Sequence, residues 1–115
     1  MDLLGLETPC LLLDEARLRA NVVRMKAHLS HLGVAFRPHL KTAKSLDVAR
    51  IAMTSPTGSA TVSTLHEAEY FAAGGVRDMI YAVGIAPAKL ARVSAIRATR
   101  AGSANSDSSM SGFSA

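Results

Sequence analysis

The sequence is poor in cysteine and in aromatic residues. Among its 115 residues there is one cysteine and no tryptophan, and aromatic residues make up 4% of the total. A single cysteine excludes a disulfide framework within the chain and a CxxC metal site. Cys10 lies beside a predicted strand, so we interpret it as a small core residue rather than a nucleophile. The core must therefore be built from Leu, Val, Ile, Ala and Met.

Long hydrophobic runs are also missing. No apolar stretch approaches the roughly 20 residues that span a bilayer. The first residues, Met-Asp-Leu-Leu-Gly-Leu-Glu, lack the basic region and the apolar region of a signal peptide. We therefore expect a cytoplasmic protein without a membrane partner.

The positive charges form no continuous run. Thirteen Lys and Arg residues against nine Asp and Glu give a net charge of +4. They are scattered along predicted helices, whereas nucleic-acid binding is typical of a clustered basic stripe with interleaved aromatics. We interpret them as solvated helix faces and expect no nucleic-acid partner.

Short apolar runs alternate with helical patterns along most of the chain. Helix starts are indicated by Asp14 and Ser45 as N-caps, by Thr64 with Glu67 as a capping box, and by Pro87 in a first turn. Between them, we predict strands at Leu11–Leu13, Val34–Phe36, Ala60–Val62 and Met79–Val83. This alternation predicts an α/β fold with a parallel sheet, either open or part of a barrel.

Composition divides the chain into three parts. Residues 1–33 hold an N-terminal strand and helix, and residues 34–98 hold three βα units. Residues 99–115 are rich in Ser, Gly and Ala without periodicity, so we expect this tail to be disordered. It is either a natural flexible tail or a premature, out-of-frame ending, and the abrupt change in mid-pattern favours the second.

Lys41 is the main candidate for chemistry. It follows the predicted strand at Val34–Phe36, at the point where a buried strand gives way to a loop. A lysine that is partly desolvated there can be neutral and form a Schiff base with an aldehyde. No glycine-rich phosphate motif, GxGxxG or GxxxxGK[ST], follows any strand, which argues against a dinucleotide or P-loop fold.

Five motifs together resemble one family. They are Glu7-Thr8-Pro9 with the strand to Asp14, the run from Arg37 to Ser45, Leu65-His66-Glu67-Ala68-Glu69, Ala72-Ala73-Gly74 and Pro87-Ala88-Lys89-Leu90. Over about residues 6–97, the chain is similar to the D-threonine aldolase and D-serine dehydratase family of fold-type III pyridoxal phosphate (PLP) enzymes. The resemblance implies part of a (β/α)₈ TIM barrel of the alanine racemase N-terminal type.

The resemblance also implies a site. Lys41 would be the Schiff-base lysine for PLP at the C-terminal end of the first barrel strand, where such barrels carry their active sites. His39 either lies near the cofactor or only packs at the strand end. Ser63 and Thr64 follow the next strand and face the same rim, although Thr64 equally serves as a helix cap. Arg37 is expected to form an ion pair near the barrel mouth, with a weaker case for contact with the cofactor. Lys44 is expected to be a charge at the surface or just behind the site.

The implied reaction is cleavage of a β-hydroxy-D-amino acid by a PLP-dependent lyase. It is either the retro-aldol release of glycine and an aldehyde or the loss of the β-hydroxyl of D-serine. Relatives of full length are expected to be homodimers with a divalent metal, whose ligands would lie beyond Ala115. This chain departs from the pattern at Ala43, where family members often carry His.

Two other functions stay open. One is a non-catalytic PLP-binding protein of the same barrel type that serves cofactor homeostasis. The other is an inactive, truncated remnant, because about 250 residues make a complete barrel and this chain holds about three of its eight units. We expect the 115 residues alone to be poorly stable and to lack PLP-dependent activity.

Overall fold

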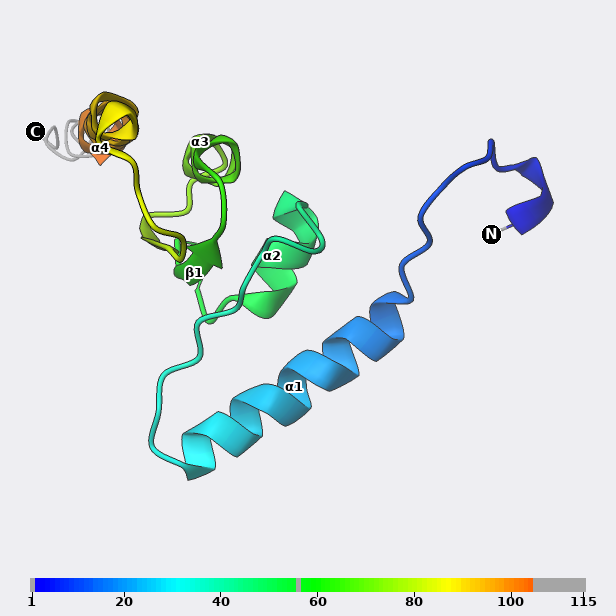
Figure 1. Cartoon of the computed structure of the whole chain (residues 1–115). Helices are drawn as coiled ribbons and strands as arrows, with labels where there is room; N and C mark the ends of the chain where they lie inside the picture. The colour runs from blue at the N-terminus through cyan, green and yellow to red at the C-terminus, as the bar shows by residue number, and fades with distance from the viewer. Residues whose placement is uncertain (1, 56, 105–115) are drawn as a thin grey trace, which may run out of the picture. The chain divides into compact units, whose positions relative to one another are not determined.

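The computed structural model describes residues 2–55 and 57–104 (Figure 1). The chain divides into two compact units, residues 1–34 and residues 35–115. Each unit has its own helices, and the second contains the sheet. The two units are therefore described separately.

The first unit consists of a short 3₁₀ helix and one long α-helix. The 3₁₀ helix η1 covers Leu3–Gly5, and α1 covers Glu15–His31. Asp14 caps α1 as predicted, because its side chain accepts a hydrogen bond from the Arg17 N–H at 2.9 Å. Gly33 follows the helix with φ +67°, a left-handed conformation that favours glycine and ends a helix.

The strand predicted at Leu11–Leu13 is wrong. These residues form no strand, and Leu11 is 100% exposed, with Leu12 and Leu13 also exposed. A strand requires a neighbour for its backbone N–H and C=O groups. No described segment pairs with Leu11–Leu13, so the apolar run alone did not produce one.

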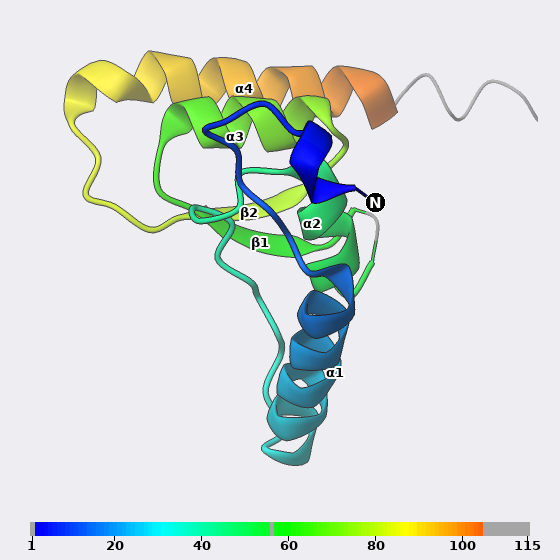
Figure 2. The same ribbon diagram turned by 90° about the vertical axis from the view of Figure 1, so that its right-hand side faces the viewer.

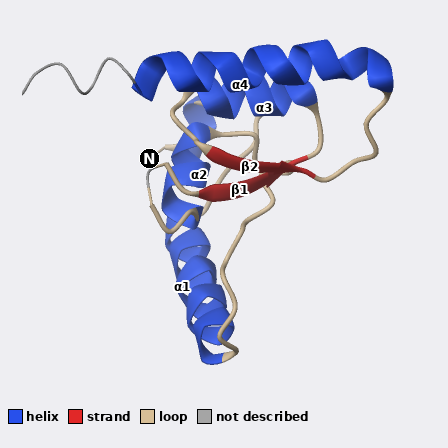
Figure 3. Cartoon of the chain, turned by 90° about the vertical axis from the view of Figure 1, so that its left-hand side faces the viewer, coloured by secondary structure: helices blue, strands red, loops and turns tan. Residues whose placement is uncertain are grey.

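The second unit is built around a parallel pair of strands. Strand β1 covers Ser59–Val62 and β2 covers Asp78–Tyr81, with Ser59 opposite Asp78 and Val62 opposite Tyr81. The two strands lie side by side beneath a helical layer (Figure 3). The predicted strands at Ala60–Val62 and Met79–Val83, and their parallel arrangement, are thereby confirmed, although β2 ends at Tyr81.

Pairing with β1 begins later in the chain than predicted. Val34–Phe36 forms no strand, and the segment pairs with β1 further on, at Pro38–Leu40. Thr61 N–H donates to the Pro38 carbonyl at 2.8 Å, Leu40 N–H donates to the Thr61 carbonyl at 2.9 Å, and His39 bridges Thr61 in parallel. Leu40 is buried whereas Val34 is exposed, so burial favours the later register.

Three helices follow the extended segments. Helix α2 covers Leu46–Ala52, α3 covers Leu65–Ala73, and α4 covers Leu90–Ala104 after the 3₁₀ turn η2 at Pro87–Lys89. Ser45 caps α2, and Thr64 with Glu67 forms the predicted capping box of α3. Helices α3 and α4 run side by side over one face of the sheet (Figures 2 and 3). The sequence therefore predicted all three helices correctly.

The end of α3 packs closely on α2. Gly74 caps α3, and a Cβ at this position would overlap the side chain of Leu46. The Leu46 N–H also donates to the Tyr70 hydroxyl at 3.3 Å, which joins the two helices. Gly75 then takes φ +95°, and the chain turns into β2.

Helix α4 continues further than the sequence indicated. It runs to Ala104, into the segment 99–115 for which we expect disorder. Arg100, Ala101 and Ala104 are strong helix formers and favour this continuation, although Gly102 between them is a poor one. Residues 105–115, the remainder of that predicted tail, lie outside the described residues.

The core of the second unit lies between the sheet and the helices. Phe71 of α3, Val62 of β1 and Val76 are fully buried. They belong to a cluster that also contains Leu40, Met53 and Ile96. Phe71 touches Tyr70 edge to face, with ring centroids 5.0 Å apart. The buried Leu40 is thus held immediately before Lys41.

We expect Phe71→Ala to lower the free energy of unfolding by about 3–5 kcal/mol, because it removes a buried ring and leaves a cavity. The matched control is Ile80→Ala on β2, a residue that is 50% exposed. Urea denaturation should show a loss for Ile80→Ala of less than about half that for Phe71→Ala. Equal losses for the two variants would contradict this location of the core.

Candidate active site at the carboxyl ends of the parallel strands

Parallel pairing brings two loops to the same end of the sheet, where the strands finish. Lys41 directly follows Leu40, and Ser63 and Thr64 directly follow β1. Because the segment 38–40 runs parallel to β1, both loops leave from the carboxyl ends. The residues predicted for the site, which are Lys41, His39, Ser63 and Thr64, therefore lie at the carboxyl end of the sheet.

His39 connects these two loops. Its Nδ1 accepts a hydrogen bond from the Lys41 backbone N–H at 3.3 Å, and its Nε2 lies 3.2 Å from the Ser63 Oγ. Since Nδ1 is an acceptor, we assign the proton to Nε2, which then donates to Ser63. In this tautomer the ring contacts both the Lys41 backbone and the Ser63 hydroxyl.

The Lys41 side chain is exposed. The partial desolvation considered from the sequence is not seen, because Lys41 belongs to a turn beyond the buried Leu40. Its backbone is nevertheless held, since its N–H bonds to His39 and the turn is closed by a bond from Lys44 N–H to the Leu40 carbonyl at 3.1 Å. The exposed side chain therefore starts from a fixed backbone at the strand ends.

Ser63 and Thr64 have different partners. Ser63 is half-buried and its hydroxyl contacts His39, whereas its contact with a cofactor stays a prediction. Thr64 is exposed, and its Oγ1 accepts from the Glu67 N–H at 3.0 Å as the cap of α3. The capping role of Thr64 is thus observed, whereas its contact with a cofactor stays a prediction.

Glu67 is the site residue that sequence reasoning missed. It is only 5% exposed, and its Oε2 accepts hydrogen bonds from the backbone N–H groups of Ser63 at 2.8 Å and of Thr64 at 3.3 Å. Its Oε1 lies 3.6 Å from the Lys44 Nζ. The capping box was visible in the sequence, but it did not reveal that the same carboxylate reaches the loop of Lys41.

These contacts lower the pKa of Glu67 from its ordinary value of 4.5. The hydrogen bond from Ser63 N–H is the largest cause, and the bond from Thr64 N–H and the charge of Lys44 act in the same direction. Burial opposes them, because it disfavours a charged carboxylate. The favourable contacts prevail, so Glu67 is held as an anion.

Lys44 has an unusual backbone conformation. Its φ is +47°, in the left-handed region that residues with a Cβ rarely adopt. Its amine reaches Glu67 while most of the side chain stays exposed, which agrees with the surface charge that we predicted. The structure adds that this charge is paired with a buried carboxylate.

Arg37 lies at the opposite end of the sheet. It forms a two-pronged ion pair with Asp78, with Nη1–Oδ1 at 3.0 Å and Nη2–Oδ2 at 2.7 Å. Asp78 and its partner Ser59 are the first residues of β2 and β1. The ion pair was predicted correctly, but its location near the barrel mouth is wrong. Arg37 precedes the paired segment 38–40 and therefore meets the amino ends of the strands.

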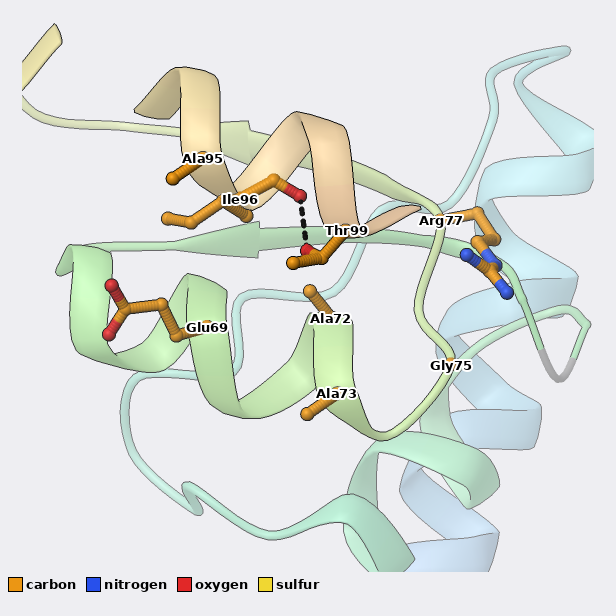
Figure 4. Close-up of a pocket in the computed structure, with 8 residues that line it drawn as sticks. All are labelled: Glu69, Ala72, Ala73, Gly75, Arg77, Ala95, Ile96 and Thr99. Atoms are coloured by element: carbon orange, nitrogen blue, oxygen red, sulfur yellow. Dashed lines mark hydrogen bonds between the residues drawn. The ribbon is translucent and has the colours of Figure 1, made fainter. Parts of the chain in front are cut away.

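A pocket between α3 and α4 is separate from this site. Its volume is about 430 Å³, and it is lined by Glu69, Ala72, Ala73, Gly75, Arg77, Ala95, Ile96 and Thr99 (Figure 4). Its two charged residues, Glu69 and Arg77, lie at opposite ends of the pocket. None of the predicted site residues lines it. We interpret it as a packing gap between two helices.

The described part of the chain contains no cluster of metal-ligating side chains. Within the ranges 2–55 and 57–104, no three His, Cys, Asp or Glu side chains gather as metal ligands would. In the same ranges, no helix combines the length and apolar character needed to cross a membrane. Cys10 is exposed, so the core position that we predicted for it is wrong.

The lowered pKa of Glu67 predicts how Glu67→Gln changes stability with pH. A carboxyl whose folded pKa lies below 4.5 stabilises the fold above that pH, and the contribution disappears as pH falls through the folded pKa. Urea unfolding at several values between about pH 3 and pH 7 should show the variant less stable near neutrality and the difference shrinking in acid. A difference that grows on acidification would contradict this account.

The Arg37–Asp78 pair predicts a measurable coupling. In a double-mutant cycle with Arg37→Gln and Asp78→Asn, we expect a favourable interaction of up to about 1 kcal/mol, because the pair is two-pronged but partly solvated. Urea denaturation of the four proteins measures it, and added salt should reduce it. Strictly additive losses would show that the pair does not join the two segments energetically.

Comparison with known proteins places the fold. D-threo-3-hydroxyaspartate dehydratase of Delftia sp. (strain HT23) is 42% identical over 95 residues, which are 83% of this chain and 25% of that protein. Its solved structure has a TM-score of 0.78 over 84% of this chain and 25% of its own. D-serine dehydratase of Dictyostelium discoideum is 33% identical over 77% of this chain and 24% of its own length.

A third relative carries a different activity in its name. 3-Hydroxy-D-aspartate aldolase of Paracoccus denitrificans (strain Pd 1222) is 36% identical over 88% of this chain and 27% of its own length. The chain thus spans about a quarter of the length of the curated relatives that it matches. These relatives confirm the predicted resemblance to D-hydroxyamino acid dehydratases and aldolases.

The family model for the alanine racemase N-terminal domain matches residues 13–101. That range contains α1, both strands and most of α4. The predicted fold class, part of a (β/α)₈ barrel of the alanine racemase N-terminal type, is confirmed by this match and by the structural likeness. The chain belongs to the alanine racemase N-terminal domain family.

Proposed function

We propose that this chain supplies the cofactor-binding lysine of a PLP-dependent lyase acting on β-hydroxy-D-amino acids. The observation that carries the proposal is the position of Lys41. It directly follows the carboxyl end of a strand segment, its side chain is exposed, and its backbone N–H is bonded to His39, which also contacts Ser63. The names of three relatives, two dehydratases and one aldolase of D-hydroxyamino acids, support this substrate class.

The residues at the strand ends fit PLP by their donor set. Lys41 would hold the cofactor covalently through its amine, and PLP, when bound, supplies an electron sink for the carbanion formed at the substrate. His39 donates to Ser63, so the hydrogen of the Ser63 hydroxyl can be donated to an anionic acceptor. Thr64 accepts from the Glu67 N–H, so its hydroxyl hydrogen can be donated in the same way.

His39 has an orienting role in this proposal. The imidazole holds the Lys41 N–H on one nitrogen and the Ser63 hydroxyl on the other. A rigid backbone beneath Lys41 limits the directions that its flexible side chain can take. Orientation of a reacting group lowers the entropic cost of reaction. Retro-aldol cleavage and loss of the β-hydroxyl would both use a lysine that is oriented in this way. The proposal includes both reactions, because the relatives named above are two dehydratases and one aldolase.

Borohydride trapping tests the lysine assignment. The chain is incubated with PLP and reduced, and the modified lysine is located by peptide mass spectrometry. We expect modification at Lys41 in preference to the other lysines, and its loss in Lys41→Arg. Lys89→Arg, in η2, is the matched control and should leave the yield at Lys41 unchanged. Even labelling of all lysines would refute the assignment.

Competition by amino acids tests the substrate class. An amino acid that binds at the site competes with Lys41 for PLP and lowers the trapped yield. We expect D-serine to lower it more than L-serine at the same concentration. Equal effects of the two enantiomers, with Lys41 still labelled selectively, would support a PLP-binding protein without this substrate class.

A further inference from the structure

Glu67 and Lys44 join the loop of Lys41 to the loop that follows β1. One Glu67 oxygen accepts from the backbone of Ser63 and Thr64, and the other reaches the Lys44 amine. Ser63 in turn contacts His39, which holds the Lys41 N–H. The contacts therefore form a closed ring around the turn that carries Lys41.

We propose that Glu67 is a positioning residue for Lys41 and acts through Lys44 and Ser63. This inference rests on the proposed function of Lys41 as the PLP-binding lysine. It adds that a buried carboxylate outside the reacting groups sets the position of that lysine.

The geometry of the turn carries the first step of the argument. Leu40 is fixed at one end, since it is buried and its N–H bonds to Thr61. Lys44 closes the turn through its N–H bond to the Leu40 carbonyl. Its positive φ costs free energy that the chain must recover elsewhere, and the ion pair with Glu67 is the side-chain contact that adds to this backbone bond in holding the residue.

Burial of Glu67 carries the second step. A carboxylate that is 5% exposed has few alternative rotamers, and its two backbone donors, Ser63 and Thr64, tie this first-turn residue of α3 to the loop that precedes the helix. Helix α3 is anchored in the core by Phe71. Lys44 therefore pairs with a rigid anion, whereas a pair between two exposed side chains would leave the turn free to move.

The same helix offers a control. Glu69 pairs with Arg92 of α4 through two contacts, with Nη2–Oε2 at 2.6 Å. Glu69→Gln removes one negative charge from α3, as Glu67→Gln does, but it breaks a contact between α3 and α4. Any effect that is shared by both variants reflects the charge or stability of α3.

The experiment measures the rate at which PLP and borohydride modify Lys41 in the 115-residue chain. We expect Glu67→Gln and Lys44→Met each to slow modification about threefold, the scale of one partly solvated ion pair. Lys44→Arg should retain the wild-type rate, and the double variant should be no slower than either single variant. Glu69→Gln should not change the rate.

Backbone amide exchange gives a second reading that does not need PLP. Exchange at residues 41–44 should accelerate in Glu67→Gln and Lys44→Met, but not in Lys44→Arg or Glu69→Gln. Unchanged exchange and modification in Glu67→Gln would overturn the inference while leaving Lys41 as the proposed PLP lysine. If PLP fails to label Lys41 selectively in the wild-type chain, the proposed function fails, and the exchange data alone then decide the role of Glu67 in holding the turn.

Discussion

Parallel pairing of the segment 38–40 with β1 is the constraint on which the site depends. It consists of two backbone hydrogen bonds, which together place His39 opposite Thr61. Because the two segments point the same way, the residues that follow them meet at one edge. His39 can then contact Ser63, and Glu67 can reach Lys44. A shift of this pairing by one residue would exchange the faces of the sheet on which the His39 and Leu40 side chains lie.

The two ends of this small sheet serve different purposes. At the amino ends, the Asp78 carboxylate accepts hydrogen bonds from Arg37 and from the Ser59 hydroxyl, which joins three segments. At the carboxyl ends lie Lys41, Ser63 and Thr64, the residues that we propose contact the cofactor. This division agrees with (β/α)₈ barrels in general, in which one end of the strands stabilises and the other carries the chemistry.

Local signals in the sequence predicted the helices well and the strands unevenly. Asp14, Ser45 and Thr64 each cap the helix expected of them, because capping depends on residues within one turn. Leu11–Leu13 and Val34–Phe36 failed because a strand depends on a partner distant in sequence. The position of Lys41 after a paired segment was predictable. The link from Glu67 to Lys44 was not, because it depends on how α3 packs against a separate loop.

Strand β2 pairs with β1 on one side, and within the described residues its other side has no neighbouring strand. That outer edge presents regularly spaced N–H and C=O groups over four residues, whereas the opposite margin of the sheet is a single bridge next to a proline. The edge of β2 therefore offers a longer row of backbone groups for pairing with a further strand than the segment 38–40 does. A strand that paired with β2 in the parallel sense would extend the row of carboxyl ends away from Lys41.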